Sequence, residues 1–422
     1  MNTVAIILFI LTYALLLTFP TKRAHVAITS AILFVILGIL PIGEVLTAVN
    51  WNVIFMIVGT MGVVNLFIES KMPSLLADVI IEKTPNVKWT IISLSLFAGI
   101  ISAFVDNVAT VLMVAPVAIT IAKKLKISPV NSVIAISIAS NLQGAATLVG
   151  DTTSILLGGA LGMNFLDFFF FEGKPGLFWI VQIGAVASTF VLLYIFRKDK
   201  QSVESLGRTK VKDYFPTVLL VGIIVLLIIA SFLPNMPENI NGIICMAMFA
   251  IGLIRKVIVT KDLAALNVAA EEIDYTTILL LTGLFVIIGG LVNVGVVDDI
   301  GNLFTKISDN PFVIYTIIVW ASVLCSAFID NIPYVATMLP VVGAITTNLG
   351  MDGSYLLYFG LLIGATLGGN LTPIGASANI TGLGILRKEG YEVKASEFMK
   401  ISVPFTLVAV MAGYVMIWFL WK

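Results

Sequence analysis

The sequence predicts an all-α protein that crosses a membrane many times and contains two inverted-topology repeats. Three observations predict this fold: a very apolar composition, a bias of Lys and Arg to alternate loops, and motifs that recur at nearly constant spacing. Of the 422 residues, 59% are hydrophobic and 11% are charged, whereas soluble domains carry roughly 25% charged residues.

Long apolar segments alternate with short charged clusters along the chain. Clear examples are residues 3–19, 26–40, 177–196, 216–233 and 401–420. At about 1.5 Å per residue as helix, such segments span a hydrocarbon core of roughly 30 Å, with local thinning where they are short. We expect about ten membrane-crossing helices, together with two re-entrant hairpins and two broken helices.

Composition also excludes several classes of function. The net charge is zero, so no basic surface for nucleic acid is expected. His25 is the single histidine, and Cys245 and Cys325 lie in apolar segments without Cys-x-x-Cys spacing. The sequence has no Gly-Lys-Ser/Thr phosphate loop. We therefore expect neither an enzyme nor a bound cofactor.

The basic residues predict the topology. If successive spans alternate in direction, all but three of the 24 Lys and Arg residues fall on one face of the membrane, which is then the inside. The three exceptions are Lys174, Lys306 and Lys422. This arrangement predicts a plasma (inner) membrane protein with both termini outside.

The two halves of the chain repeat each other. Ser102-Ala-Phe-Val-Asp106-Asn107 matches Ser326-Ala-Phe-Ile-Asp330-Asn331 at an offset of 224 residues. Gly144-Ala-Ala-Thr147-Leu-Val-Gly150 matches Gly369-Asn-Leu-Thr372-Pro-Ile-Gly375 at 225. Residues 1–200 form the first repeat, 201–213 a cytoplasmic linker and 214–422 the second repeat. The topology runs the repeats in opposite directions, as in many secondary transporters.

Each repeat contains an apolar hairpin whose turn carries an Asp-Asn pair. The arms are only about 15–16 residues, which is short for a full crossing. A re-entrant hairpin places Asp106, Asn107, Asp330 and Asn331 near mid-membrane, whereas arms that cross fully make them surface turns. The repetition of an acidic tip favours the re-entrant interpretation.

A second feature follows each hairpin. Residues 131–162 and 354–386 are too long for single spans and are rich in glycine and small polar residues at their centres. We interpret both as helices interrupted within the membrane, where unwound carbonyls suit cations and helix N-termini suit anions.

Carboxylates in hydrocarbon are costly, so Asp106, Asp151 and Asp330 require partners or a proton. They either cap turns and pair internally, or form two half-sites for cation and solute. Asp151 aligns with Ala376, and Asn370 aligns with Ala145. The first half-site thus carries more charge, and we expect Na⁺ or the proton-carrying group there, at Asp106, Asn107 and Asp151.

These motifs resemble the arsenite-permease and sodium/proton-antiporter branch of the ion transporter superfamily, which includes the melanosomal P protein and is related to divalent-anion/sodium symporters. The resemblance implies a homodimer in the lipid bilayer, with a static scaffold and a mobile elevator part in each protomer. By position, the scaffold is 1–88 and 214–310, and the mobile part is 89–196 and 311–422. The resemblance also implies a site at the tips and interruptions: Asp106, Asn107, Thr147, Asp151, Asp330, Asn331, Asn370, Thr372 and Asn379.

The leading hypothesis is a secondary transporter coupled to Na⁺ or H⁺ that moves a small anion or oxyanion-type solute. No Lys or Arg lies within the predicted membrane segments, so helix dipoles, amides and a bound cation would hold the anion. The same absence supports an alternative hypothesis, Na⁺/H⁺ antiport by Asp106, Asp151 and Asp330. A channel or a membrane-embedded enzyme is less well supported.

Overall fold

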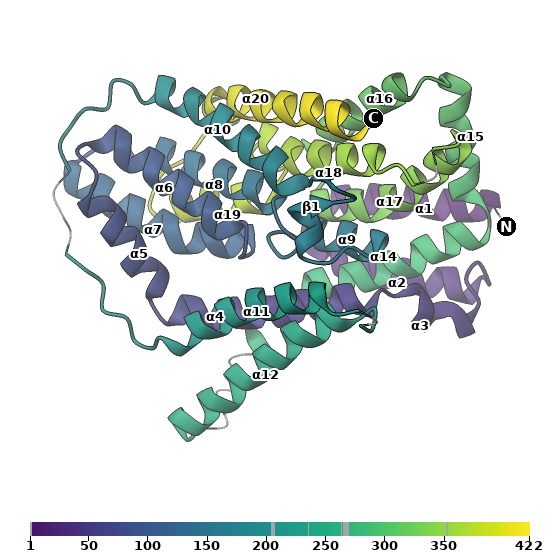
Figure 1. Ribbon diagram of the computed structural model, residues 1–422, viewed down its shortest axis with the longest axis horizontal. Helices are drawn as coiled ribbons and strands as arrows, with labels where there is room; N and C mark the ends of the chain where they lie inside the picture. The colour runs from purple at the N-terminus through teal and green to yellow at the C-terminus, as the bar shows by residue number, and fades with distance from the viewer. Residues whose placement is uncertain (1, 204–206, 235, 263, 265–269, 352) are drawn as a thin grey trace.

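The computed structural model describes every residue except 1, 204–206, 235, 263, 265–269 and 352. Parts of the linker 201–213 and of the ranges 1–88, 214–310 and 311–422 therefore lie outside the described residues. Nearly all regular structure in the described part is helical (Figure 1). The exception is a two-residue antiparallel pairing of β1 (Phe170–Phe171) with β2 (Lys174–Pro175).

Seven of the described helices are long and apolar enough to cross a membrane. They are α4 (Trp51–Glu69), α7 (Asn107–Leu125), α10 (Leu177–Ile195), α11 (Phe215–Phe232), α12 (Ile240–Thr260), α14 (Tyr275–Asn293) and α20 (Ala395–Trp421). An eighth candidate is the pair α1 (Asn2–Thr18) and α2 (Arg23–Ile36), which meet at 113°. The described part also contains shorter apolar helices at Val87–Ser102, Thr152–Leu161, Pro311–Ser326 and Leu356–Leu371, and the expected ten crossings stay a prediction.

The remaining elements are short. They are η1 (Pro20–Lys22), η2 (Ile42–Glu44), α3 (Val45–Ala48), α5 (Met72–Glu82), α6 (Val87–Ser102), α8 (Val130–Gly144), α9 (Thr152–Leu161), η3 (Leu166–Phe168), α15 (Val296–Ile307), α16 (Pro311–Ser326), α17 (Asn331–Asn348), α18 (Leu356–Gly368), η4 (Gly369–Leu371) and α19 (Ser377–Lys388).

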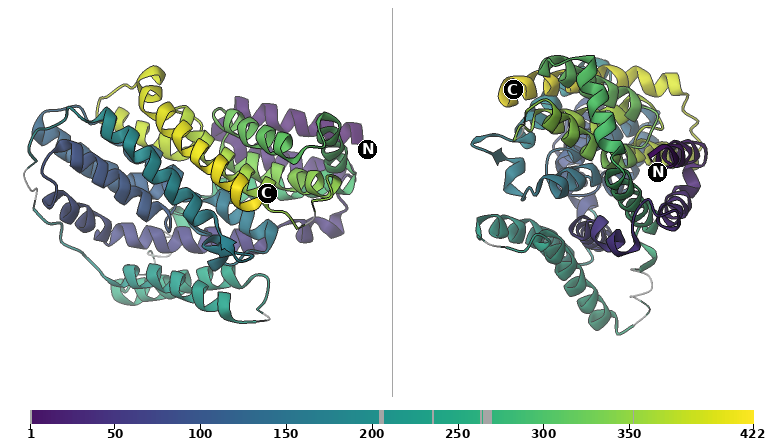
Figure 2. Two further views of the ribbon diagram at one scale, coloured as in Figure 1. Left: turned by 45° about the horizontal axis from the view of Figure 1, so that its top comes forward. Right: turned by 90° about the vertical axis from the view of Figure 1, so that its right-hand side faces the viewer.

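The helices pack in two groups (Figures 1 and 2). In one group α4 packs on α12 and α2 packs on α14. Glycine permits both close crossings, because a Cβ on Gly59 would lie 2.3 Å from the carbonyl carbon of Cys245, and one on Gly283 would lie 2.7 Å from that of Ala27. In the other group α6 packs on α8, α16 on α18, and α10 on α20.

Two hairpins, α6–α7 and α16–α17, carry the Asp-Asn pairs at their tips. Figure 1 places them toward opposite ends of the molecule. Asp106 and Asp330 are the N-caps of α7 and α17, and each accepts backbone N–H bonds through Oδ1. The expected arm length is correct for α6 and α16, with 16 residues each. The helices α7 and α17 have 19 and 18 residues, because α7 continues past its apolar run through Lys123 and Lys124 and α17 runs from Asn331 of the tip to Asn348.

The interruptions expected within 131–162 and 354–386 are present. The first lies between the end of α8 at Gly144 and the start of α9 at Thr152. The second lies between the end of α18 at Gly368 and the start of α19 at Ser377, and contains η4. Both interruptions are buried over most of their length, so their backbone polar groups need partners within the protein or a bound ion.

In its described part, the linker between the two halves is bound to α5 by an ion pair and hydrogen bonds. Arg208 forms an ion pair with Glu82 of α5 at 2.9 Å, and Thr209 donates through its backbone and hydroxyl to the buried Asp78 carboxylate at 2.8 and 2.6 Å. These contacts fasten the linker along α5, which leads into the first hairpin.

A candidate solute and cation site at the hairpin tips

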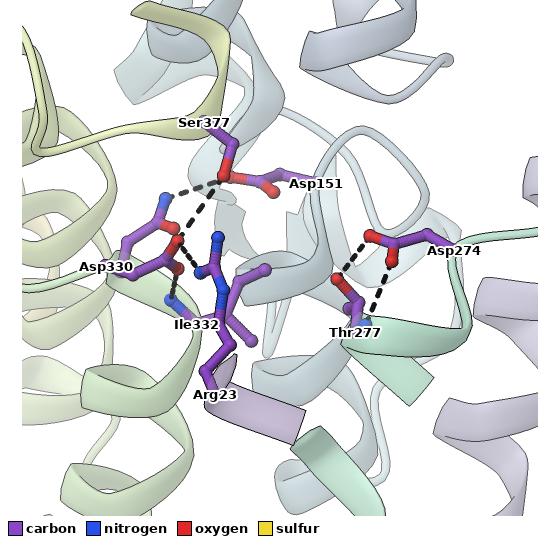
Figure 3. A network of polar contacts seen from close by, with 8 residues as sticks. Arg23, Asp151, Asp274, Thr277, Asp330, Ile332 and Ser377 are labelled. Carbon is purple, nitrogen blue, oxygen red and sulfur yellow. Dashed lines mark hydrogen bonds and ion pairs between the residues drawn. The ribbon is translucent and has the colours of Figure 1, made fainter. Parts of the chain in front are cut away.

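Both hairpin tips, the first interruption and the start of α19 border one cavity of about 640 Å³. Four of the expected site residues line this cavity: Asp106, Asn107, Asp151 and Asn331. The α1–α2 connection and the start of α14 complete the wall. In Figure 3, Arg23, Asp330, Ser377 and Asp151 gather on one side, and Asp274 and Thr277 lie on the other.

The first tip is held to the first broken helix by amide side chains. Asp106 Oδ1 accepts the N–H groups of Val108 and Ala109 at 3.0 and 3.1 Å. Asn107 Nδ2 donates to Asn141 Oδ1 at 3.0 Å, and Asn141 Nδ2 donates to the carbonyl of Thr366 at 2.8 Å. Asn141 therefore joins the first tip to α18 of the second half.

Asp151 lies where the two halves meet. Its side chain is almost fully buried, and its Oδ2 accepts from the hydroxyl of Thr153 at 3.1 Å and from Nδ2 of Asn331 at 3.4 Å. The second hairpin tip thus contacts the carboxylate of the first interruption, and both half-sites belong to one site.

The second tip differs from the first in its charge partner. Asp330 Oδ1 caps α17 through the N–H of Ile332 at 3.0 Å. Asp330 Oδ2 accepts from Arg23 Nη1 at 2.5 Å and from the hydroxyl of Ser377 at 3.4 Å. The expectation that no basic side chain accompanies the site is wrong, because Arg23 of α2 reaches the tip instead of lying on a separate inner loop.

The expected Thr and Asn residues of the interruptions bind backbone carbonyls. The Thr147 hydroxyl donates to the carbonyl of Ala103, and that of Thr372 donates to the carbonyl of Ala327. Asn370 Nδ2 donates to the carbonyl of Ile138 at 2.9 Å. Asn379 Nδ2 donates to two carbonyls of the second interruption, at 3.1 and 3.2 Å.

Three carbonyl oxygens converge beside Gly150, in an arrangement that we call the first carbonyl cradle. A Cβ on Gly150 would lie 2.7 Å from the oxygen of Gly144 and 2.9 Å from those of Ala103 and Ser102. Two of the three oxygens end α6, where carbonyls lack helical partners and carry partial negative charge. The Ala103 oxygen also accepts from the hydroxyl of Thr147, and the Gly144 oxygen accepts from that of Ser154 at 3.1 Å.

The second carbonyl cradle repeats this geometry beside Gly375. A Cβ there would lie 2.6 Å from the oxygen of Gly369, 2.7 Å from that of Ser326 and 2.8 Å from that of Ala327. Buried oxygen acceptors without a hydrogen-bond partner among the described residues accompany the two cradles: Ser102 Oγ, Asn370 Oδ1 and Asn379 Oδ1. Clustered acceptors of this kind suit a cation.

The electrostatics of the cavity are mostly negative. Four carboxylates line it: Asp106, Asp151, Glu272 and Asp274. Burial, and next the neighbouring Glu69, raise the pKa of the Glu272 carboxyl. Among the described lining residues Arg23 carries the one positive charge.

A second, larger cavity of about 1060 Å³ contains none of the expected site residues. It lies between α9 and the helices α4 and α12, and amide side chains such as Asn50, Asn164 and Asn241 line it. Asn50 Nδ2 donates to the carbonyl of Gly159 at 3.3 Å, which joins the two helix groups there.

Comparison with known proteins identifies the family. Residues 13–360 match the citrate transporter family (CitMHS). The chain belongs to this family. It is a multi-pass membrane transporter, as the apolar helices of the fold indicate.

Two relatives of this citrate transporter family member bear on the resemblance to the superfamily. An uncharacterized transporter of Mycobacterium bovis is 31% identical over 99% of this chain and 98% of its own length. The P protein of Sus scrofa is 24% identical over 88% of this chain and 53% of its own length. The resemblance to the superfamily that contains P protein is therefore confirmed.

A solved structure supports the fold. The YdaH transporter of Alcanivorax borkumensis aligns with a TM-score of 0.61, at 13% identity, over 89% of this chain and 86% of the other. The expected polytopic all-α class is confirmed, whereas the inverted direction of the repeats and the number of crossings stay predictions.

Sequence reasoning missed three residues of the site in this citrate transporter family member. Asn141 and Thr366 lie in the two broken helices at an offset of 225 residues, so the repeat spacing was a usable signal. Thr366 also shares a hydroxyl contact of 2.9 Å with Thr153. Arg23 had no such signal, because its partner lies 307 residues away.

Proposed function

We propose that this member of the citrate transporter family is a secondary transporter that couples Na⁺ or H⁺ to the movement of a small carboxylate or other oxyanion. The observation that carries the proposal is the pair of carbonyl cradles where both hairpin tips meet both interruptions. Such cradles replace the hydration shell of a cation with backbone oxygens.

The cation would bind more strongly in the first half of the site. Asp151 lies beside Gly144, whose carbonyl belongs to the first cradle, and the residue in the equivalent place beside Gly369 is Ala376. Asp106 adds a second carboxylate to the same cavity, whereas Asp330 is engaged by Arg23. The coupling ion is therefore assigned to Asp106, Asn107 and Asp151 with the first cradle.

The solute would occupy the cavity between the tips. Its volume of about 640 Å³ suits a small organic anion. The N-termini of α9 and α19 border this region, and neither has a side-chain cap. Free N–H groups at helix starts attract anions. The printed name of the family makes citrate the first solute to test.

Alternating access would follow from relative movement of the two helix groups. The proposal assigns 1–88 and 214–310 to a scaffold and 89–196 and 311–422 to a mobile part, in an elevator-type cycle within a homodimer. Support comes from the close packing of α4 on α12 and of α2 on α14 within the scaffold, of α6 on α8 and of α16 on α18 within the mobile part, and from a cavity on either side of the α4–α9 contact. Inverted repeats suit this cycle.

The first experiment is thermal unfolding of the purified protein in Na⁺, K⁺ and choline chloride. A cation that binds the folded state stabilises it by about 2.7 kcal/mol at one hundred times its Kd. We expect Na⁺ to stabilise the wild type, Asp106→Ala to lose the effect, and Asp330→Ala to keep most of it. Citrate uptake into proteoliposomes with an imposed Na⁺ gradient tests transport, and equal uptake without any cation gradient contradicts the coupling.

The alternative function is Na⁺/H⁺ antiport, and the four carboxylates of the cavity favour it. In that case Asp106 and Asp151 would exchange Na⁺ for H⁺ without an organic solute. Vesicles that contain a pH-sensitive dye distinguish the two functions. A sodium gradient that changes the internal pH in the absence of any carboxylate identifies the antiporter, whereas a change that requires citrate identifies the symporter.

A further inference from the structure

We propose that Arg23 is the anion-recognition residue of this transporter, and that the solute binds by taking the place of the Asp330 carboxylate on the Arg23 guanidinium. This inference rests on the proposed function. The Arg23–Asp330 ion pair in the wall of the site is then exchangeable: the Asp330 carboxylate occupies the guanidinium until a carboxylate of the solute replaces it.

The guanidinium has capacity for a second acceptor. Arg23 carries five N–H donors, and among the described residues only Nη1 has a hydrogen-bond partner, Asp330 Oδ2 at 2.5 Å. The side chains of Arg23 and Asp330 are 27% and 16% exposed. Arg23 is therefore reachable from the cavity, and its remaining donors can bind a carboxylate in the planar, two-point geometry that suits guanidinium.

Asp330 can release Arg23 without losing its own position. Its Oδ1 caps α17 through the N–H of Ile332 at 3.0 Å, and only Oδ2 is bound to the guanidinium. The uncapped N-terminus of α19, at Ser377, lies on the same side of the pair. Its partial positive charge favours a second anion at this position.

The scaffold holds Arg23 firmly at the tip. The Thr12 hydroxyl donates to that of Ser30 at 2.8 Å, which joins α1 to α2. The Tyr13 hydroxyl donates to the carbonyl of Pro333 at 2.7 Å, one turn into α17. The α1–α2 connection thus contacts the second hairpin in this conformation, and Arg23 is placed before the solute arrives.

Charge explains why such a residue is needed. The other charged side chains among the described cavity residues are four carboxylates, and they repel an anion. A cation in the carbonyl cradles offsets part of that repulsion, but the cradles lie behind the tips. Arg23 supplies the positive side chain on the cavity wall itself, so it determines preference for anionic over neutral solutes.

The test measures binding of citrate to purified protein in saturating Na⁺, by calorimetry, for five variants. Arg23→Gln should weaken binding by about tenfold or more, the loss of one charge-assisted hydrogen bond. Asp330→Asn keeps the helix cap and removes the competitor, so it should tighten binding by about twofold to fivefold. The double variant should match Arg23→Gln, and Arg23→Lys should lie between it and the wild type. Lys22→Gln, which removes the neighbouring exposed charge, should have no effect.

The inference is tested by the opposite changes in citrate affinity that we expect for Arg23→Gln and Asp330→Asn. A merely structural ion pair weakens binding equally in Arg23→Gln and Asp330→Asn, and that result overturns the inference. Unchanged affinity in Arg23→Gln also overturns it. A preserved Na⁺-dependent thermal shift verifies that Arg23→Gln is folded. If Arg23→Gln does not fold, the changes in citrate affinity of Arg23→Lys and Asp330→Asn should still have opposite signs. A wild type that binds neither citrate nor other mono-, di- and tricarboxylates refutes the proposed function, and this inference falls with it.

Discussion

A single methyl group at Gly150 should block the first carbonyl cradle. In Gly150→Ala the new Cβ would lie 2.7 Å from the oxygen of Gly144 and 2.9 Å from those of Ala103 and Ser102. Ordinary carbon–oxygen contacts lie at about 3.3–3.6 Å, so each carbonyl must retreat by roughly half an ångström. Overpacking of this size costs about 1–3 kcal/mol of folding free energy. Because the three oxygens already lie close to Gly150, moving them apart changes the geometry of the first cradle.

The assay is thermal unfolding across a sodium titration. The wild type should gain about 2.7 kcal/mol at one hundred times the Kd, and Gly150→Ala should lose most of that gain in addition to its lower stability without sodium. Gly384→Ala is the matched control, because a Cβ on Gly384 in α19 has nothing within 4 Å. If Gly150→Ala keeps the full sodium-dependent stabilisation, and the sodium concentration that gives half of it is unchanged, the cradle does not bind the cation.

Three further predictions concern packing at the site and an ion pair at the start of α11. A Cβ on Gly159 would lie 2.5 Å from Val53 Cγ2, so Gly159→Leu should slow citrate uptake by about tenfold through overpacking of the α4–α9 contact, and Val53→Ala should restore part of the rate. Asn141→Leu removes both hydrogen bonds that join the first tip to α18, and should destabilise the protein by about 1–3 kcal/mol in thermal unfolding. Although burial opposes it, Arg255 holds the pKa of Asp213 below its ordinary value. This contact therefore stabilises the folded protein above about pH 4, and that stabilisation is lost as the pH falls through the folded pKa. Asp213→Asn should lower the free energy of unfolding at neutral pH, and the variant should lose less stability than the wild type when the pH is lowered.

The hairpin tips and the interruptions could be predicted because each is a contiguous motif that occurs twice. A pair such as Asp106 and Asp330, at one offset, identifies two turns with the same local chemistry. Helix capping by Asp then follows from local geometry alone. The lengths of α7 and α17 could not be predicted as well, because an apolar run does not show at which residue a helix ends, and α7 continues through Lys123 and Lys124.

Contacts between distant parts of the chain were the part that sequence reasoning could not supply. Arg23 follows an apolar segment, and the sequence predicts that it is a charge on an inner loop, because the positive-inside rule treats every short loop alike. Its ion pair with Asp330 depends on how α1 and α2 lie against α17. Asn141 is one of several polar residues of α8, and only packing of α8 against the first tip and against α18 gives it its two partners.

The two halves have matching cradles but unequal charge, and this difference leads to a last prediction. Asp151 Cβ lies 2.9 Å from where a Cβ on Gly144 would be, and Ala376 Cβ lies 3.2 Å from the equivalent point on Gly369. The carbonyl geometry is thus repeated, whereas only the first cradle has a carboxylate beside it. Because a nearby negative charge strengthens cation binding most where water is excluded, the first cradle should have the higher sodium affinity.

Asp151→Ala tests this reasoning, since it gives the first half the side chain that the second half already has. A sodium titration of the wild type should require two binding constants, one for each cradle. Asp151→Ala should lower the sodium affinity of the first cradle toward that of the second. Gly375→Ala, which obstructs the second cradle, should remove the weaker one and leave the tighter one unchanged. If Asp151→Ala alters neither constant, the carboxylate takes no part in cation binding, and the proton becomes the ion that Asp151 would carry.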